Sequence, residues 1–293
     1  MRAWKHQIAG LTTALIATHA NAVSLEFDFT YDTSGFFTQA DALASLNAAG
    51  ALFESRLQDS LAGIVPAAGE SFEVRFSRPD TGVLSGVERS IAADTLVIYV
   101  GARELGGALG EGGPGGFSAS SFGGGDLSAS LPPLRGQTGP DFGPWGGAMT
   151  FDASADWYFG ADAAGLGGGQ SDFYSVALHE IAHVLGVGTS ATWGSWVSGG
   201  EFSGPAVQAV AGGPVALTDD GGHFAEGTLS LVMGISQEAA LDPNLTTGTR
   251  KHLTDLDWAA LEDIGWEVAP VPLPAALWLL AAPLFGLTVW RRS

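Results

Sequence analysis

The chain has 293 residues, which is enough for one large domain or two small ones, and a formal net charge of −19. Its 12 Lys and Arg residues, against 31 Asp and Glu residues, form no visible basic patch, which argues against binding to nucleic acid. The absence of Cys excludes disulfides, a thiolate zinc site and a cysteine nucleophile. The hydrophobic content of 46% and the nine Trp residues are ample for a buried core.

The first 22 residues have the features of a secretory signal peptide. Arg2 and Lys5 give a positive start, residues 8–17 are mainly apolar or small, and residues 20–22 form an A-x-A cleavage site. An N-terminal anchor helix is the alternative, but the apolar run is short for a membrane span. The sequence therefore predicts cleavage before Val23 and export of the rest of the chain.

The part of the chain that follows predicts a strand, a long helix and two further strands. Thr38 and Asp41 form a capping pair at the start of the helix, and its apolar residues repeat at helical spacing as far as Leu61. Alternating or continuous apolar residues predict the strands. The predicted elements are a strand at 23–30, a helix at 38–61, and strands at 71–76 and 95–100.

Residues 101–147 are rich in glycine and lack periodicity, which predicts a long loop. This loop is either a flexible surface insertion or the edge of a cleft, and the sequence leaves both interpretations open. Residues 148–159 (AMTFDASADWYF) are strand-like again.

Residues 171–188 (SDFYSVALHEIAHVLGVG) predict a buried helix that carries the motif H-E-x-x-H. Residues four apart lie on the same face of a helix, so His179 and His183 are spaced to bind one metal ion. Glu180 projects about 100° around the helix from His179, where it can contact a water beside the metal without binding the metal itself. Two ordinary core histidines are the alternative, but the motif favours a zinc hydrolase.

This stretch resembles the metzincin metalloproteases, whose longer motif is H-E-x-x-H-x-x-G-x-x-H. Gly186 matches the glycine, but Thr189 stands at the place of the third histidine, and threonine is a poor zinc ligand. Leishmanolysin-like members of this family carry an insertion at this point. The resemblance therefore implies that His223 is the third ligand after an insertion at about 187–222, and that Met233 lies in the turn beneath the metal.

The resemblance also implies an α+β fold of the zincin type. Its expected features are a twisted mixed sheet with an antiparallel edge strand, packed on a long helix and on the H-E-x-x-H helix, and a smaller irregular C-terminal subdomain that ends in a helix. The protease domain would cover 23–268, with an upper subdomain at 23–186 and a lower one at 187–268. In many zincins the strand at the position of 148–159 is the edge strand that pairs with an extended substrate.

The last element predicted for this domain is a helix. Thr254 and Asp257 form its capping pair, and Gly265 ends it. His252 lies just before this helix and is the other histidine that could complete the metal site, although residues before a cap are usually solvated. The alternatives for the third ligand therefore include His252 as well as His223.

A gluzincin-like site would instead take a glutamate from a downstream helix, for which Glu238 and Glu262 are the candidates. Asp219 and Asp220 could also bind a metal, but we expect them to face solvent or to hold a neighbouring loop. These alternatives stay open at the level of the sequence.

Zn²⁺ is therefore the expected cofactor, because catalytic zinc usually takes three protein ligands and one water. A structural calcium ion is a second hypothesis. Asp152, Asp156 and Asp162 form a loose acidic group near the predicted edge strand, and carboxylates are the ligands that Ca²⁺ prefers.

Residues 269–293 resemble the PEP-CTERM sorting signals of Gram-negative bacteria, in their Val-Pro-Leu-Pro-Ala form. Leu273 replaces the usual glutamate, an apolar run follows at 275–290, and Arg291 and Arg292 would stay on the cytoplasmic side. The resemblance implies processing by an exosortase-type enzyme and delivery to the cell surface or beyond. A plain C-terminal transmembrane anchor is the alternative.

The sequence thus predicts a secreted zinc endopeptidase that acts on proteins or peptides, with Glu180 as general base and His179, His183 and His223 as metal ligands. Two other functions stay open. One is an inactive or weakly active surface or matrix binding protein on a zincin fold, and the other is a zinc hydrolase of a non-peptide amide.

Overall fold

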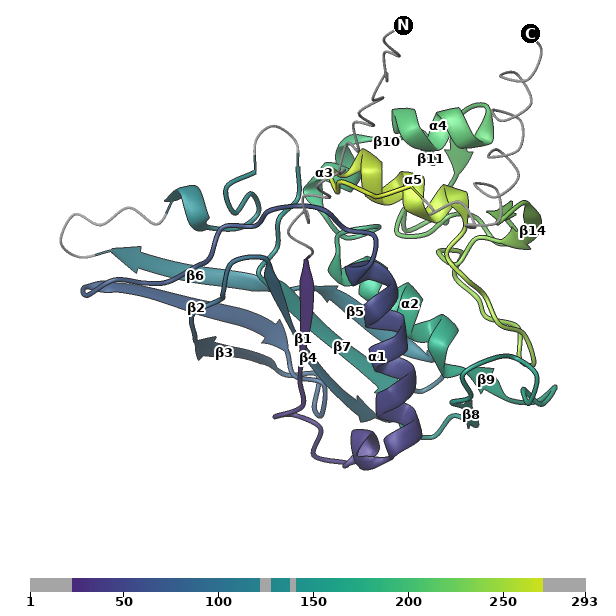
Figure 1. Cartoon of the computed structure of the whole chain (residues 1–293), viewed down its shortest axis with the longest axis horizontal. Coiled ribbons are helices and arrows are strands. Elements are labelled where there is room, and N and C mark those ends of the chain that lie inside the picture. Colours follow the sequence, from purple (N-terminus) through teal and green to yellow (C-terminus); the bar gives the residue numbers. More distant parts are fainter. Residues whose placement is uncertain (1–22, 122–127, 138–140, 271–293) are drawn as a thin grey trace, which may run out of the picture.

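The computed structural model describes residues 23–121, 128–137 and 141–270. Its centre is a four-stranded sheet in the order β1-β4-β7-β5, in which the first three strands are parallel and β5 is an antiparallel edge strand (Figure 1). The strands are β1 (Ser24–Asp28), β4 (Thr95–Arg103), β5 (Gly110–Pro114) and β7 (Gly146–Asp152). The chain therefore has an α+β fold with a mixed sheet and an antiparallel edge, as the sequence predicted.

The edge strand is a different segment from the one that we expected. Residues 148–159 were expected at the edge, but β7 lies between β4 and β5, with Met149 opposite Gly112 and Phe151 opposite Gly110. The actual edge strand lies within the segment 101–147, for which the sequence predicted a loop. Glycine has no side chain, so β5 shows no alternation of apolar and polar residues, and only its backbone pairing with β7 reveals it as a strand.

Two helices, α1 (Ala40–Glu54) and α2 (Phe173–Val184), cover one face of the main sheet (Figure 1). The side chains of β4 contribute to a core on each face of the sheet, because successive side chains of a strand point to opposite faces. Ile98 and its neighbours on one face join the core with the helices, whereas Val97 and Tyr99 join a second core on the other face. β4 is therefore buried on both faces, which explains why its sequence is a continuous run of apolar residues and not an alternating one.

Helix α1 is shorter than the sequence predicted. The capping pair of Thr38 and Asp41 is wrong, because Gln39 is the N-cap and the hydroxyl of Thr38 donates to the carbonyl of Gly35. The helix ends at Glu54, yet Leu57 is still buried, as the helical pattern required. Beyond the helix the backbone of residue 57 instead bridges to residue 268, so tertiary pairing replaces the last helical turn.

The second core lies beneath an antiparallel sheet in the order β3-β2-β6. Its strands are β2 (Glu70–Ser77), β3 (Leu84–Glu88) and β6 (Gly116–Ser121). The ring of Phe76 on β2 stacks on Tyr99 of β4 at 3.9 Å between centroids, and Trp145 closes this core. β2 and β4 were predicted, whereas β3 and β6 were missed because most of their side chains are exposed or partly exposed and give no buried face.

The chain after α2 forms short helices and small strand pairs. The largest is α5 (Asp255–Asp263), which has the predicted capping box of Thr254 and Asp257 and ends before Gly265, whose φ is 108°. The other elements after α2 are α3 (Ala191–Ser195), β10 (Val197–Ser198), β11 (Glu201–Phe202), α4 (Pro205–Ala211), β12 (Val215–Ala216), β13 (Leu229–Val232) and β14 (Ile235–Glu238). Short elements before α2 are η1 (Phe36–Thr38), η2 (Ser128–Ser130), β8 (Trp157–Tyr158) and β9 (Ser171–Asp172).

The two predicted targeting segments fall largely outside the described residues. The expected signal peptide at 1–22 lies outside the described residues. Residues 271–293, which are nearly all of the expected sorting or transmembrane segment, also lie outside them. Within the described part of the chain, every helix is too short or too polar to cross a membrane. Export and surface delivery therefore stay predictions from the sequence.

Candidate metal centre

Helix α2 carries the H-E-x-x-H motif and is held firmly at both ends. At its start the carboxylate of Asp172 accepts hydrogen bonds from Ser175 and forms an ion pair with Arg250 at 2.6 Å. At its end Gly186 has a φ of 106°, and a Cβ there would lie 2.5 Å from the ring of Phe142. Only glycine fits this turn, which confirms the position that the sequence predicted for the end of the helix.

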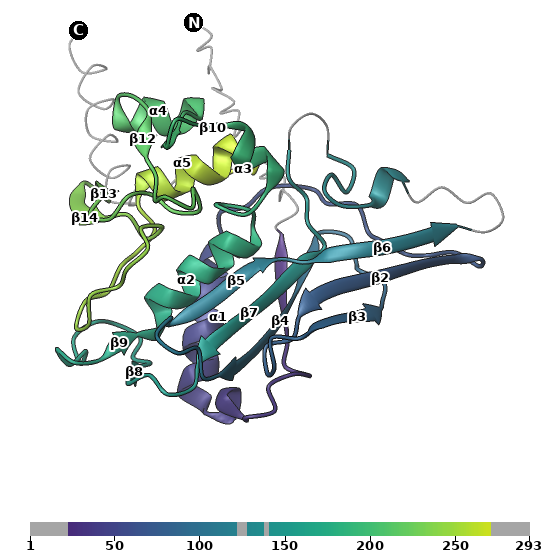
Figure 2. The same cartoon turned by 180° about the vertical axis from the view of Figure 1, so that it is seen from behind.

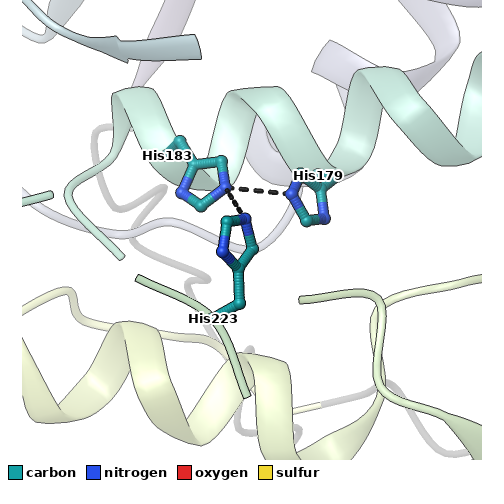
Figure 3. A group of neighbouring side chains, drawn as sticks. All are labelled: His179, His183 and His223. Atoms are coloured by element: carbon teal, nitrogen blue, oxygen red, sulfur yellow. Dashed lines mark hydrogen bonds between the residues drawn. The ribbon is translucent and has the colours of Figure 1, made fainter. Parts of the chain in front are cut away.

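Three histidine side chains converge below this helix, as Figure 3 shows. The Nε2 atom of His183 lies 2.9 Å from that of His179 and 3.0 Å from that of His223. The two helix residues point the same way because they are one turn apart, and His223 reaches them from a separate loop. Within the described residues, this is the one group of three or more His, Asp or Glu residues arranged to hold a metal ion.

Backbone carbonyls set the tautomers of two of these histidines. The Nδ1 atom of His179 lies 2.7 Å from the carbonyl oxygen of Ala240, and that of His183 lies 2.9 Å from the carbonyl oxygen of Val187. A carbonyl can only accept, so Nδ1 carries the proton and Nε2 keeps a free lone pair in the neutral ring. Both Nε2 lone pairs therefore face the centre of the group, which is the arrangement of metal-binding imidazoles.

Burial keeps the three imidazoles neutral. It lowers the pKa of His183 to about 4, with the neighbouring His223 as the second cause. Burial also lowers the pKa of His179 well below its usual value and lowers the pKa of His223, although Asp220 opposes the latter shift. Neutral imidazole is the form that binds a metal, so the electrostatics of the site agree with its geometry.

The loop that carries His223 is shaped by contacts close to α2. A Cβ at Gly188 would lie 2.0 Å from the carbonyl oxygen of Gly222, so glycine is required there for the loop to approach the helix end. Thr189, which replaces the third histidine of the longer motif, donates its hydroxyl to the carbonyl of His183 at 2.7 Å. Thr189 therefore stabilises the turn at the end of α2, and the third histidine, His223, comes from the loop that follows.

The carboxylate of Asp220 organises the same loop. It accepts hydrogen bonds from the hydroxyl of Thr218 and the backbone N–H of Gly222, and both Asp219 and Asp220 are exposed. The prediction that these two residues face solvent or hold a loop is confirmed. Oδ1 of Asp220 also lies 4.0 Å from Nδ1 of His223, near enough to favour the orientation of that ring electrostatically.

Glu180 lies beside the three histidines and is buried, with 4% of its surface exposed. Burial, and secondarily the charge of Glu111, raise the pKa of Glu180 to about 8. A divalent cation at the histidines would oppose this shift by favouring the charged carboxylate. A carboxyl group whose pKa lies near neutrality is suited to exchange protons with a reacting molecule.

The histidines and Glu180 line a cleft of about 680 Å³. Strand β5 forms one wall, and the segment that follows the buried turn Ala239–Asp242 forms the other. In the second wall the ammonium group of Lys251 lies 2.6 Å from Asp242 and 3.0 Å from Glu238. The cleft therefore runs between the edge of the main sheet and the C-terminal part of the domain.

The other ligand candidates lie elsewhere. The exposed His252 packs its ring near Tyr174 and takes no part in the group of three. Glu238 pairs with Lys251, and Glu262 is exposed on α5. The structure thus brings His223 to the helix pair and leaves the three other candidates outside the site.

Met233 does not lie beneath the histidines. It occupies the tip of the β13–β14 hairpin, with a φ of 50° and 79% of its surface exposed. The expectation of a buried methionine turn at this residue is therefore wrong. The turn that contacts His179 is Ala239–Asp242, where the carboxylate of Asp257 accepts hydrogen bonds from the backbone N–H groups of Ala240 and Leu241. This turn contains a leucine, Leu241, and no methionine, so a methionine pattern in the sequence could not indicate it.

The three acidic residues proposed for calcium are not brought together. Asp152 accepts hydrogen bonds from Ser154, Asp156 accepts one from Gln170, and Asp162 accepts one from the backbone of Ala164. Asp152 and Asp162 thus stabilise their own turns and Asp156 joins its turn to the segment before α2, and the three form no ligand group among the described residues. The structure thus gives no support to a calcium site here.

Several residues of the site carried no signal in the sequence. The carbonyls of Ala240 and Val187 belong to the backbone, and Gly110 and Gly112 present only backbone to Glu180.

Comparisons of the chain with models of known protein families, with curated proteins and with solved structures find no match.

Proposed function

We propose that this chain is an exported zinc-dependent endopeptidase with a zincin-type domain. The observation that carries the proposal is the convergence of three neutral imidazoles on one point, with a buried carboxyl group beside them in an open cleft. The mixed sheet, with an antiparallel edge strand next to the histidine-bearing helix, supports the proposal of a zincin-type domain. Export rests on the sequence features of the two chain ends.

The donor set favours zinc over the hard cations. His179, His183 and His223 offer three nitrogen atoms, whereas Ca²⁺ and Mg²⁺ prefer oxygen ligands. Nitrogen ligands of a tetrahedral zinc ion are about 3.3 Å apart. The Nε2 atom of His183, at 2.9 Å from that of His179 and 3.0 Å from that of His223, would need to move only slightly from both to share one ion with them. A zinc ion held in this way supplies Lewis acidity, which lowers the pKa of water and polarises a carbonyl group.

Glu180 is the proton carrier in this proposal. Its carboxylate takes the proton of the attacking water and later delivers that proton to the leaving amine. Its burial in the cleft removes competing water, which strengthens electrostatic interactions with the reacting groups. No other titratable side chain on α2 between the two helix histidines can share this work, because the residues between them are Glu180, Ile181 and Ala182.

The substrate lies along β5 in this proposal. β5 is the last strand of the main sheet and lines the cleft, so an extended peptide can pair with its free edge. In this proposal β5 takes the substrate-binding role that the resemblance to zincins implied for residues 148–159. A cleft open along a strand suits an endopeptidase better than it suits an enzyme for small amides.

Zinc analysis and protein hydrolysis together test the proposed function. The purified chain should contain about one zinc ion, as expected for one three-histidine site, and should cleave casein. A chelator should abolish the cleavage, and added Zn²⁺ should restore it. Zinc binding without cleavage of casein or of a mixed peptide pool would instead favour a surface binding protein or a hydrolase of non-peptide amides.

A further inference from the structure

Two glycines of β5 lie directly against the carboxylate of Glu180. A Cβ built at Gly110 would lie 2.5 Å from Oε1 and 2.8 Å from Cδ of Glu180, and one built at Gly112 would lie 2.8 Å from Oε2. Alternate residues of a strand share a face, so these two glycines form one bare patch of backbone. Figure 2 shows β5 running beside α2, which brings this patch to the carboxylate.

Neither β5 nor α2 can easily move away from this contact. β5 is paired with β7, where Gly110 lies opposite Phe151 and Gly112 opposite Met149, both of them fully buried. On the other side α2 is packed into the main core along most of its length. Close-packed elements of this kind respond to added volume by displacing the most flexible group, which here is the side chain of Glu180.

Packing against β5 is also what determines where this carboxylate lies. Among the residues that the structure describes, no donor forms a hydrogen bond with the carboxylate of Glu180, and Gly110 and Gly112 face it from β5. Asp172 and Asp257, two fully buried carboxylates near this helix, are by contrast held by several hydrogen bonds.

We infer that Gly110 and Gly112 are positioning residues for Glu180: the missing side chains leave the space in which its carboxylate reaches the reacting water. This inference rests on the proposed function, because the position of Glu180 matters for catalysis only if Glu180 carries the proton. It also gives the glycine-rich segment a role at the edge of the cleft, which is one of the two interpretations that the sequence left open.

Gly110 is the sharper residue to test. The three atoms nearest to a Cβ there all belong to the side chain of Glu180, whereas a Cβ at Gly112 would lie 2.6 Å from the backbone carbonyl oxygen of Glu180 and would push the helix that carries two metal ligands. Gly194 is the control, since it is exposed on α3, does not line the cleft, and a Cβ there meets nothing within 4 Å. Neither Gly110 nor Gly194 has a positive φ, so alanine adds volume without backbone strain.

The kinetic experiment compares Gly110→Ala with Gly194→Ala in the full chain loaded with zinc. We expect Gly110→Ala to lower kcat for fluorescein-labelled casein at least about 10-fold, because a small displacement of a proton-transfer group is costly. Its KM should stay within about twofold, because the open cleft is unchanged, and its zinc content should equal that of the wild type. Gly194→Ala should keep the kcat of the wild type. Equal kcat values for Gly110→Ala and the wild type would overturn the inference.

A thermal experiment tests the contact without any enzymatic activity. Gly110→Ala should lower the Tm by about 3 °C or more in the wild-type background. In the background of Glu180→Ala, where the opposing side chain is gone, the same substitution should have almost no effect on the Tm, which is the signature of a direct contact in a double-mutant cycle.

The two experiments separate failure of this inference from failure of the proposed function. A wild-type chain that binds zinc but hydrolyses no protein contradicts the proposed function, while the thermal cycle still reports whether the glycines and Glu180 touch. A decrease in Tm that persists in the Glu180→Ala background means that Gly110 is needed for the strand itself, and this outcome overturns the inference even if the wild type is an active peptidase.

Discussion

The Nε2 atoms of His183 and His223 lie 3.0 Å apart, although 40 residues separate the two histidines in the chain. The intervening segment leaves the end of α2 through Gly186, forms α3, α4 and a small antiparallel sheet, and returns past Gly188 to the same point. The metal site is therefore shared between a helix and a loop that becomes adjacent to it only in the folded chain.

Substitution of His223 with alanine should abolish zinc binding at this site. Loss of one of three ligands should lower the affinity more than the roughly 10- to 100-fold that loss of an outer-shell partner causes. The measurement is the zinc content after dialysis, together with a titration against a chromogenic chelator. His252→Ala is the control, because this exposed histidine lies outside the group, and it should bind zinc like the wild type. Loss of zinc from His252→Ala with retention in His223→Ala would contradict our assignment.

Substitution of Glu180 with glutamine should separate metal binding from hydrolysis. The amide is close in size to the carboxyl group that it replaces, but it cannot accept the proton of the attacking water, so kcat should fall by about 10²- to 10⁴-fold. Zinc content should be unchanged, since Glu180 is not one of the three ligands. Initial rates of casein cleavage and metal analysis on the same sample provide the test. A variant with full activity would show that another group carries the proton.

Asp59 should make the stability of the protein depend on pH. Burial raises the pKa of this carboxyl to about 6, with the charges of Glu267 and Asp141 as lesser contributions. Because the folded-state pKa lies above the usual value of 3.8, the folded chain holds the proton between about pH 4 and pH 6 and the unfolded chain does not. The stability that this proton provides is therefore lost as the pH rises through 6.

The variant Asp59→Asn should remove this dependence. Asn can still accept the hydrogen bond that the backbone N–H of Glu267 donates, and its amide can pair with Gln137 after rotation of the Gln137 side chain. Relative to the wild type, we expect the variant to become more stable by at most about 2 kcal/mol as the pH rises from 4.5 to 7, because the wild type loses its bound proton over this interval. Urea unfolding at both pH values, with a chelator present, measures the difference. An equal difference at both values would contradict the prediction.

The two turns that follow His223 should differ in their tolerance to substitution. Met233→Ala changes an exposed side chain at a hairpin tip, so zinc content should be unchanged and the free energy of unfolding should change by less than about 0.5 kcal/mol. Leu241→Ala removes a side chain with 1% of its surface exposed from the turn that contacts His179, and should cost about 2–5 kcal/mol. Urea unfolding of both variants provides the measurement, and a larger loss for Met233→Ala would restore that residue as part of the site.

Local patterns predicted the elements that their own residues stabilise. The helix at 171–188, the helix that begins at Thr254, and the strands at 71–76 and 95–100 were all found near their predicted positions. Each has a repeat of apolar residues or a capping pair, which act over a few residues and are visible in sequence. The helix at 38–61 was overextended because its apolar repeat continues into the core after the helix has ended.

The elements that the sequence missed depend on contacts across the fold. β5 forms because β7 offers it a backbone partner, and its glycines lie against Glu180 of a helix about 70 residues later. The capping box of α5 was predicted, but its second role, in which Asp257 holds the turn beside His179, depends on how α5 packs. Met233 was assigned by its distance from His223 in sequence, and such a distance does not define which turn folds inward.

The sequence by itself determined that His179 and His183 share one helix face with Glu180 next to them, since this follows from the 3.6-residue repeat of the helix. It also narrowed the third ligand to a few residues. Only the tertiary structure decided that His223 completes the group, that Ala239–Asp242 is the supporting turn, and that bare glycine backbone lies against Glu180. Those relationships join segments far apart in the chain, and their geometry is set by packing and backbone pairing, for which no local repeat exists.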